Sequence, residues 1–300
     1  MKVTNDTELT IQDVAEERQQ GHTTRKYLYT ALEKALGIPV VAYFTSFRYA
    51  VTITDDDANM LEQILQKCDI KKGFALMISS PGGSGLAAER IVNTCRSYSG
   101  TGEYVTIVSG KAKSAATIIC LGSSKILMSK TSELGSIDPQ IVMEEEGKVK
   151  WFSVYNVVKS YRDLFSKAVK EKGNLQPYLQ QLANYDEREI AEFEAALALT
   201  DDMAVKILKT GMLSSKTPSQ IKRQIHRFLT PEEVKVHGRP IYAQEAKNCG
   251  LNVDMIDLRS KRWALTRELY IRLDSFVSTD DIAKCIECEH YSFRAKVRGS

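Results

Sequence analysis

Between residues 39 and 128, short apolar segments alternate with longer segments in which apolar residues recur at helical spacing. Short apolar strands joined by helical crossovers are typical of a largely parallel sheet covered by helices. The alternation therefore predicts an α/β fold assembled from repeated ββα or βαβ units. The strands are expected at residues 39–44, 73–79, 104–109 and 125–128, and the helices at 55–68, 85–98 and 114–122.

After residue 156 the pattern becomes helical. Apolar residues such as Ile190, Phe193 and Leu197 recur three to four positions apart, which indicates an amphipathic helix. We interpret the region of about 157–236 as a helical insertion or arm. Its helices are expected at 157–169, 175–182, 186–208, 217–229 and 230–236.

These patterns divide the chain into three parts. Residues 1–38 are expected to be an N-terminal helical segment, loosely attached, with its helix within 9–36. Residues 39–260 form the main domain, which carries the insertion, and residues 261–300 form a C-terminal helix and tail. The remaining expectations are a solvated hairpin tip at 144–146, a helix at 243–248, a strand at 252–256 and a terminal helix at 261–276.

The composition excludes several classes of protein. The 41 lysines and arginines nearly balance the 38 aspartates and glutamates, and a net charge of +3 is too small to mark a nucleic-acid surface. The most apolar runs, at 38–47 and 117–128, are shorter than the roughly 20 residues of a membrane span. A polar, acidic start at 1–17 and six scattered cysteines fit a reducing compartment. We therefore predict a cytoplasmic protein with no nucleic-acid partner and no membrane span.

A glycine-rich turn follows the second predicted strand and precedes a helix. Residues 80–85 read SPGGSG, and the glycines at 82 and 83 permit backbone geometry that a Cβ would block. Such a turn can present free N–H groups to an anionic oxygen. The lysine and Ser/Thr of a phosphate-binding loop are missing. Alone, this turn is more often only a tight connection, so its meaning depends on the other motifs.

A second turn follows the next predicted strand and also opens a helix. Residues 109–117 read SGKAKSAAT, and Ser114 stands beside small residues that let a substrate backbone approach. The helix N-terminus there favours developing negative charge. Taken alone, a serine at this position is usually only a helix N-cap. A third turn, ELGSIDP at 133–139, follows the next strand.

In this order the three turns resemble the Clp protease and signal peptide peptidase A superfamily. The chain is similar above all to the serine dehydrogenase proteinase family, the soluble relatives of signal peptide peptidase A. The resemblance covers roughly 39–140 and returns at 241–254, where IYAQEA and the Gly250-Leu251 pair look like the closing helix and strand of the family. It implies the ClpP/crotonase fold and a serine peptidase that acts on peptide or protein substrates without a cofactor.

The resemblance also implies roles for single residues. Ser114 takes the place of the nucleophile, and the backbone N–H groups of Gly83 and Ala115 take that of the oxyanion hole, with Gly82 shaping the turn. The chain on either side of the site would hold an extended peptide by strand addition. Because relatives form rings or stacked oligomers, a homo-oligomer is expected, with the arm as a contact.

The sequence leaves open which group activates Ser114, since a serine hydroxyl needs a neighbouring base. Clp-type peptidases have a histidine after the third turn, whereas this chain has Asp138 there. His237 directly precedes the closing motif, near the place of the Clp-type aspartate. Because the geometry of a triad matters more than its chain order, an exchanged triad of Ser114, His237 and Asp138 is one prediction. A plain surface histidine is the alternative.

A serine and lysine dyad of the signal peptide peptidase A type is the rival prediction. Lys159 is its candidate base, one or two residues off the family's spacing. Burial could depress the pKa of such a lysine enough for the role, although lysines near helix starts are usually solvated. Lys111 and Lys113 lie close to Ser114 in sequence and are expected to face substrate or solvent.

The sequence alone also allows two other functions and contains one motif that resembles part of a metal site. Ser114 would be only an N-cap in a non-catalytic binding module, and an acyl-CoA-binding member of the same fold would not require a serine there. Cys285, Cys288 and His290 have the spacing of half a zinc site. A second pair of ligands would have to come from a partner chain or a C-terminal extension, so no metal is predicted for this chain.

Overall fold

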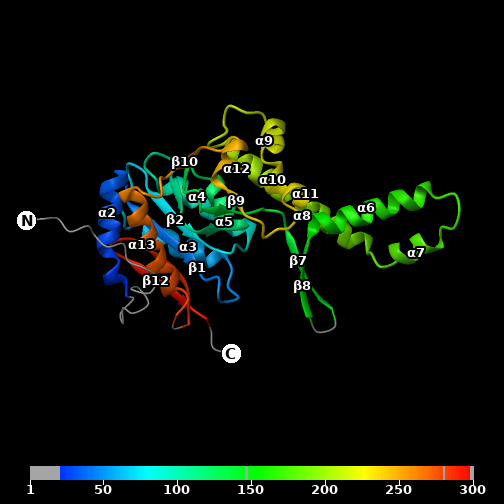
Figure 1. Cartoon of the computed structure of the whole chain (residues 1–300), viewed down its shortest axis with the longest axis horizontal. Coiled ribbons are helices and arrows are strands. Elements are labelled where there is room, and N and C mark those ends of the chain that lie inside the picture. The colour runs from blue at the N-terminus through cyan, green and yellow to red at the C-terminus, as the bar shows by residue number, and fades with distance from the viewer. Residues whose placement is uncertain (1–20, 146–147, 280, 298–300) are drawn as a thin grey trace, which may run out of the picture.

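The computed structural model describes residues 21–145, 148–279 and 281–297. Its centre is a seven-stranded sheet in the order β10-β5-β3-β2-β1-β11-β12 (Figure 1). The first five strands in this order are parallel, and β11 and β12 extend the sheet in antiparallel pairs. The strands are β1 (Val40–Thr45), β2 (Ala75–Ser79), β3 (Val105–Val108), β5 (Lys125–Met128), β10 (Val253–Met255), β11 (Ile282–Glu287) and β12 (Ser292–Lys296).

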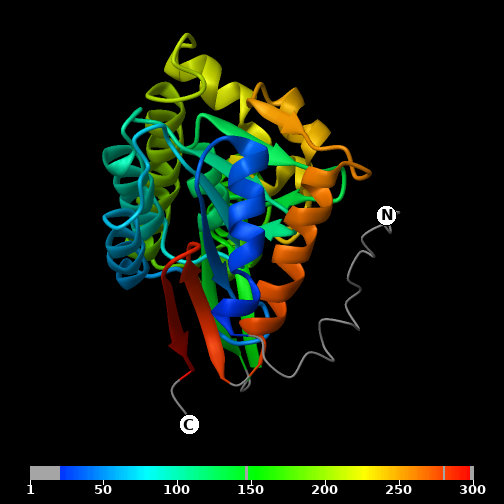
Figure 2. The same ribbon diagram turned by 90° about the vertical axis from the view of Figure 1, so that its left-hand side faces the viewer.

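Helices cover both faces of the sheet, which explains why its inner strands are apolar at nearly every position. All six residues of β1 are buried: Val41 and Tyr43 belong to the core under one helical layer, and Val40, Ala42 and Phe44 to the core under the other. Figure 2 shows α2 and α13 side by side on one face. The covering helices are α2 (Lys26–Leu36) and α13 (Lys261–Phe276) on that face, and α3 (Asp55–Leu65), α4 (Gly85–Tyr98) and α5 (Ala115–Leu121) on the other.

The fold class predicted from the sequence is confirmed: a largely parallel α/β sheet with helical crossovers. The N-terminal helix differs from its expected loose attachment. After a short helical turn, η1 (His22–Thr24), helix α2 buries Leu28, Tyr29 and Leu32 in the core. Its apolar residues fill the space beside α13, and burial of such side chains stabilises the folded state. Residues 9–20 of the predicted helix lie outside the described residues.

The C-terminal tail joins the sheet through strands that the sequence pattern did not predict. All six residues of β11 are buried, although Lys284 and Glu287 are charged. Lys284 Nζ lies 2.7 Å from an oxygen of the buried Asp57 carboxylate at the start of α3. This ion pair gives the charge of Lys284 a buried partner, and a charged residue can be buried in a strand when it has such a partner.

A small second sheet, in the order β4-β6-β9, lies beside the main one. Strands β4 and β6 are parallel, whereas β9 is antiparallel to β6. Helix α12 follows β9 directly. The bounds of these elements are β4 (Lys111–Ala112), β6 (Glu133–Leu134), β9 (Ile241–Tyr242) and α12 (Ala243–Asn248).

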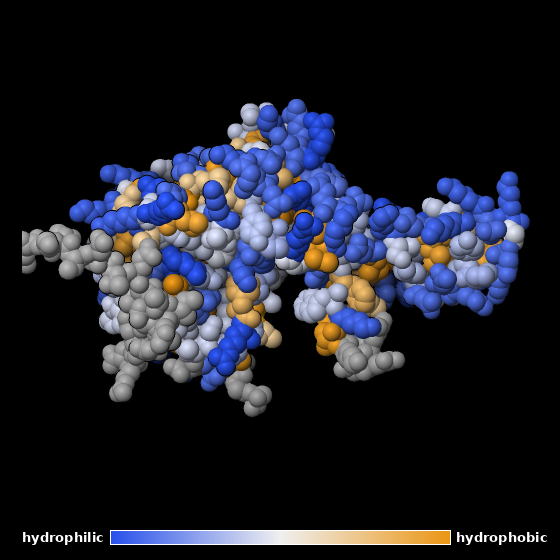
Figure 3. Space-filling model, in the orientation of Figure 1, coloured by the Kyte–Doolittle hydropathy of each residue, from blue (hydrophilic) through white to orange (hydrophobic). Residues whose placement is uncertain are grey.

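The first part of the predicted helical arm projects from the body together with a β-hairpin (Figure 1), whereas residues of its later helices, such as Met203, Ile221 and Phe228, are buried in the main core. The hairpin pairs β7 with β8 from Gln140↔Ser153 outward, and the predicted tip at 144–146 lies at its far end, partly outside the described residues. Hydrophobic surface is visible on hairpin and arm (Figure 3), where Val142, Met143 and Val149 are exposed. The elements are β7 (Gln140–Glu145), β8 (Lys148–Ser153), α6 (Val154–Lys170), α7 (Gln176–Leu182), α8 (Glu187–Lys209), α9 (Pro218–Gln224), α10 (His226–Leu229) and α11 (Pro231–Val234).

Candidate active site

Ser114 lies in the tight turn between β4 and α5. Its backbone angles, φ 51° and ψ −122°, are outside the regions that non-glycine residues usually adopt. Only Lys235 and Asp281 share a positive φ among the non-glycine residues that the structure describes. Strained backbone of this kind costs free energy and is found most often at functional sites. The turn leaves the Ser114 side chain without a capping hydrogen bond to α5.

The glycine-rich turn packs directly against Ser114. A Cβ on Gly82, which has φ +111°, would lie 2.6 Å from Ser114 Cβ, so only glycine fits there. A Cβ on Gly83 would lie 2.3 Å from Ile53 N. The backbone of Ile53 donates to Gly82 O at 2.8 Å and accepts from Ser84 N at 3.0 Å. These two bonds hold the turn on both sides of Gly83.

Two backbone N–H groups near Ser114 have no acceptor within the described residues. They belong to Gly83, between the two bonds of Ile53, and to Ala115, the first residue of α5. The first N–H groups of any helix lack partners within that helix. Two such donors beside a serine are the arrangement that stabilises an oxyanion in acyl transfer.

The small sheet brings the segments of Asp138 and His237 beside the turn of Ser114. Strands β4 and β6 run parallel, so the chain leaves both at the same edge, toward Ser114 and Asp138 respectively. Strand β9 is antiparallel to β6, so the chain enters it from that edge, just after His237. Thr117 Oγ1 ties the segments together, because it donates to Ala112 O at 2.8 Å and accepts from Gly135 N at 3.0 Å.

His237 Nδ1 lies 2.7 Å from Asp138 Oδ1, although the two residues are 99 positions apart in the chain. A carboxylate can only accept a hydrogen bond, so Nδ1 carries the proton of this bond, and in the neutral form of the ring Nε2 is the acceptor nitrogen. The Asp138 side chain is fully buried, and the His237 side chain is 20% exposed. The pair thus has one end in the protein interior and one end partly exposed to solvent.

The second oxygen of the carboxylate also has a partner. Ser153 Oγ donates to Asp138 Oδ2 at 2.7 Å, and this bond is buried. Ser153 was not singled out from the sequence, because the helix that follows it was expected to begin only at residue 157, whereas α6 begins at Val154. The only hint was its place between the hairpin and α6.

Ser114 Oγ makes no hydrogen bond to His237 within the described part of the chain. Catalytic hydrogen bonds in a free enzyme are often long and tighten only when substrate is bound. The arrangement offers a serine on a strained turn, two backbone donors and an oriented imidazole, which together can perform acyl transfer.

The lysines near the site have other partners. Lys159 Nζ lies 2.9 Å from Asp163 on the surface of α6, and its side chain is 49% exposed. The hydrogen bond to Asp163 raises the pKa of Lys159, which is the wrong direction for a general base. Lys113 forms an ion pair of 2.8 Å with Glu133 and donates to Leu134 O at 3.2 Å, and its side chain is mostly buried rather than solvent-facing.

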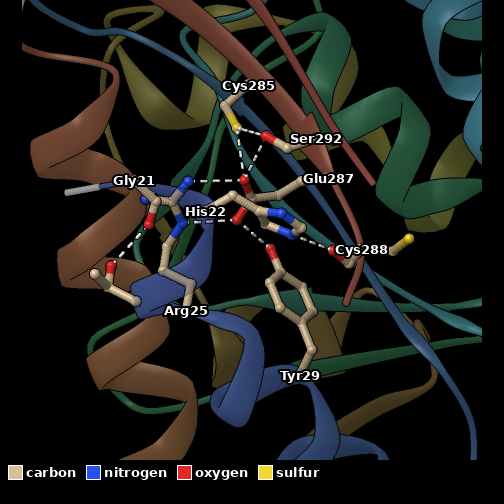
Figure 4. Close-up of polar contacts among 9 residues, drawn as sticks. Gly21, His22, Arg25, Tyr29, Cys285, Glu287, Cys288 and Ser292 are labelled. Atoms are coloured by element: carbon tan, nitrogen blue, oxygen red, sulfur yellow. Dashed lines mark hydrogen bonds and ion pairs between the residues drawn. The ribbon is translucent and has the colours of Figure 1, made fainter. Parts of the chain in front are cut away.

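The cysteine motif does not form a shared metal site. Figure 4 shows Cys285 directed toward Glu287, while the sulfur of Cys288 points away from that cluster. Residues three apart in a strand point to opposite faces, and the two cysteines belong to the cores on opposite sides of the sheet. No group of three or more His, Cys, Asp or Glu residues suited to a metal occurs among the described residues.

A hollow of about 1050 Å³ lies between the hairpin and the arm, away from Ser114. Ile141, Val142 and Phe152 of the hairpin line it together with Ile190 and Phe193 of α8. In the residues that the structure describes, no helix combines the length and the apolar character needed to cross a bilayer.

Part of the chain, including the turns around Ser114, is similar to ClpP-like serine proteinases. Residues 34–150 match the family model described as "ClpP-like SDH-type serine proteinase". The resemblance to the serine dehydrogenase proteinase family drawn from the three turns is confirmed over this region. The match includes Ser114 and Asp138 and ends before His237.

Two similar proteins come from Methanocaldococcus jannaschii. The chain is 28% identical over 218 residues to an uncharacterized protein, MJ0137, covering 73% of this chain and 63% of MJ0137. It is 24% identical over 224 residues to the uncharacterized protein MJ1495, covering 71% of this chain and 72% of that protein. The matched region thus spans less than two thirds of MJ0137.

A search of solved structures found similarity to a mutant of the 1510-N membrane-bound stomatin-specific protease. The sequence identity is 18% and the TM-score is 0.29, with 42% of this chain and 63% of that chain covered.

Proposed function

We propose that this protein is a serine endopeptidase that cleaves peptide bonds through an acyl-enzyme on Ser114. The observation that carries the proposal is the partly buried pair of His237 Nδ1 and Asp138 Oδ1, 2.7 Å apart, at the edge of the small sheet where the turn of Ser114 begins. The family match supports a serine proteinase of this type. The exchanged triad is favoured over the dyad, because Lys159 is exposed and paired with Asp163.

The first chemical step is attack on the substrate. Ser114 Oγ attacks the scissile carbonyl carbon while His237 Nε2 takes the hydroxyl proton. Asp138 keeps the other ring proton on Nδ1 and stabilises the imidazolium that forms. The free N–H groups of Gly83 and Ala115 donate to the developing oxyanion.

The second step releases the amine. His237 gives its proton to the leaving nitrogen, and the carbonyl reforms as an ester on Ser114. Water then attacks this ester with His237 again as base, which frees the acid product and restores the hydroxyl. The substrate is a peptide or protein segment in extended conformation, held by backbone hydrogen bonds. No cofactor takes part in this scheme.

Self-assembly of the chain is part of the proposal. Exposed apolar residues on the hairpin, among them Val142, Val149 and Trp151, form surface that a second copy of the chain would cover. If an oligomer enclosed the site, only unfolded segments of a substrate protein could reach it. We also propose that the protein works in the cytoplasm. In the described residues no helix is suited to span a membrane.

The test is intact-protein mass spectrometry after incubation with a fluorophosphonate probe. Wild type is expected to gain one probe group, and Ser114→Ala and His237→Ala are expected to gain none. The same samples, run in a sedimentation-velocity experiment, report the oligomer. Loss of labelling in Lys159→Ala, with His237→Ala still reactive, would favour the dyad. A wild type that never reacts would instead point to a binding module or an acyl-CoA-binding member of the fold.

A further inference from the structure

Ser153 is placed to act on the proposed triad, although it lies outside every motif that identified the site. It is the last residue of β8, at the base of the hairpin, and its hydroxyl reaches Asp138 Oδ2 at 2.7 Å. With His237 on Oδ1, both oxygens of the buried carboxylate have a hydrogen-bond partner. Ser153, Asp138 and His237 therefore form one continuous hydrogen-bonded chain.

The Ser153 hydroxyl does not cap the helix that follows it. Ser153 is the N-cap of α6, where a serine oxygen normally accepts a hydrogen bond from a backbone N–H of the first turn. No such capping bond is present in α6. The hydroxyl instead donates to Asp138, because an ionised carboxylate can only accept. A helix cap is left unmade while the carboxylate is satisfied.

Closure of the hairpin base does not require this side chain. Gln140 and Ser153 are paired by the strand ladder, and Val154 N donates to Pro139 O at 3.0 Å. Both of these contacts are made by the backbone and would remain if the hydroxyl were removed. The bond from Ser153 Oγ therefore bears on the orientation of the carboxylate more than on the path of the chain.

We propose that Ser153 is a positioning residue that holds the Asp138 carboxylate in the orientation required by His237. This inference rests on the proposed function of the triad. With Oδ2 held by Ser153, the carboxylate cannot rotate about its terminal bond without losing a buried hydrogen bond, so Oδ1 stays aligned with His237 Nδ1. A fixed Nδ1 hydrogen bond keeps Nε2 directed toward the nucleophile, and the imidazole acts as base without first reorienting.

The first experiment measures the inactivation of the full chain by the fluorophosphonate probe, with separate determination of kinact and KI. Ser153→Ala is expected to lower kinact about 10–100-fold, which corresponds to one hydrogen bond to a charged group, with KI within about twofold of wild type. Ser153→Thr keeps the hydroxyl and is expected to restore most of the rate. Ser160→Ala is the matched control, because Ser160 on the same arm bonds Tyr185 and not Asp138.

A double mutant tests whether Ser153 acts through Asp138. In the Asp138→Asn background, Ser153→Ala is expected to cause little further loss, because the group that it orients is already altered. Equal losses in both backgrounds would mean that Ser153 acts by another route, and the positioning role would be wrong. Thermal unfolding of each variant separates a folding defect from a change at the site.

A third measurement does not depend on activity. Proton NMR of the protein is expected to show a downfield imidazole N–H signal that disappears in His237→Ala and shifts in Ser153→Ala but not in Ser160→Ala. An unmoved signal and an unchanged kinact in Ser153→Ala would overturn the inference while leaving the peptidase proposal intact. A signal that depends on Ser153 in a protein that never reacts with the probe would support the positioning role and contradict the peptidase.

Discussion

Two buried carboxylates of this protein, Asp138 and Glu287, are held in different ways. Glu287 is bound by the guanidinium of Arg25, with Nε to Oε1 at 2.7 Å and Nη2 to Oε2 at 2.8 Å, and both side chains are fully buried (Figure 4). Tyr29 and Ser292 donate to the same carboxylate at 2.9 and 2.8 Å. Within the described residues, the partners of Asp138 are an imidazole and a hydroxyl, and the imidazole is partly exposed.

The difference separates a structural carboxylate from one suited to catalysis. Arg25 is always charged, so the bond to Glu287 is the same at every working pH, and it joins α2 to β11 permanently. Imidazole groups as a class can gain and lose a proton near neutral pH, and the His237 side chain is partly exposed. The pair of Asp138 with a partly exposed imidazole therefore fits the proposed active site, whereas the tighter and more complete cluster at Glu287 fits a role in the scaffold.

The strongest test of this comparison converts each carboxylate to an amide, in which an NH₂ group replaces one oxygen. Asp138→Asn is expected to lower kinact for the fluorophosphonate probe by about 10⁴-fold, because an amide favours the wrong imidazole tautomer. Its unfolding midpoint in urea should stay close to that of wild type. Glu287→Gln is expected to behave in the opposite way, with weakened stability and, in the folded fraction, a normal inactivation rate. Similar inactivation rates for the two variants would remove the distinction.

A second test removes the fixed charge beside Glu287. Arg25→Met is expected to lower the free energy of unfolding by about 3–5 kcal/mol, because it leaves a buried carboxylate without its ionic partner. Chemical denaturation at pH 7 measures the loss. The double variant Arg25→Met with Glu287→Met is the control, and it should recover much of the stability, since apolar groups of similar volume can replace a buried ion pair.

The pH dependence of the same measurement gives a further check. Burial acts to raise the pKa of Glu287, but the hydrogen bond and charge of Arg25 outweigh it and hold the pKa below its ordinary value of 4.5. A lowered pKa in the folded state contributes stability that is present above the unfolded pKa and is lost as the pH falls through the folded pKa. Wild type should therefore lose this contribution only below about pH 4.5, and Arg25→Met should lack it at all pH values.

The smallest expected effect concerns the Tyr29 hydroxyl, which donates to Glu287 as the Ser153 hydroxyl donates to Asp138. Tyr29→Phe removes the hydroxyl that donates to Glu287 and is expected to cost about 1.5 kcal/mol of stability without changing the inactivation rate. Burial raises the pKa of Tyr29, so this hydroxyl keeps its proton and acts as a donor. Thermal unfolding and the probe assay measure the two quantities on the same sample. A loss of reactivity in Tyr29→Phe would show that the two clusters are coupled.

Local pattern determined most of the fold. The helices at 85–98, 243–248 and 261–276 and the strand at 125–128 were predicted with the bounds that the structure has, because their apolar periodicity and end signals agree. The strands of the tail were missed because β11 has no alternation. It is buried on both faces, and its charged residues are satisfied by partners more than 200 positions away, Asp57 and Arg25.

The amino-acid sequence by itself determined the α/β class, the three turns in their order, and the candidacy of Ser114, Asp138 and His237. Only the tertiary structure decided that His237 bonds Asp138, that Lys159 faces solvent beside Asp163, and that Ser153 completes the carboxylate's partners. Turns and periodicity are local properties of the chain. Contacts between residues 99 positions apart depend on which strands pair, and here the pairing of β6 with β9 sets them.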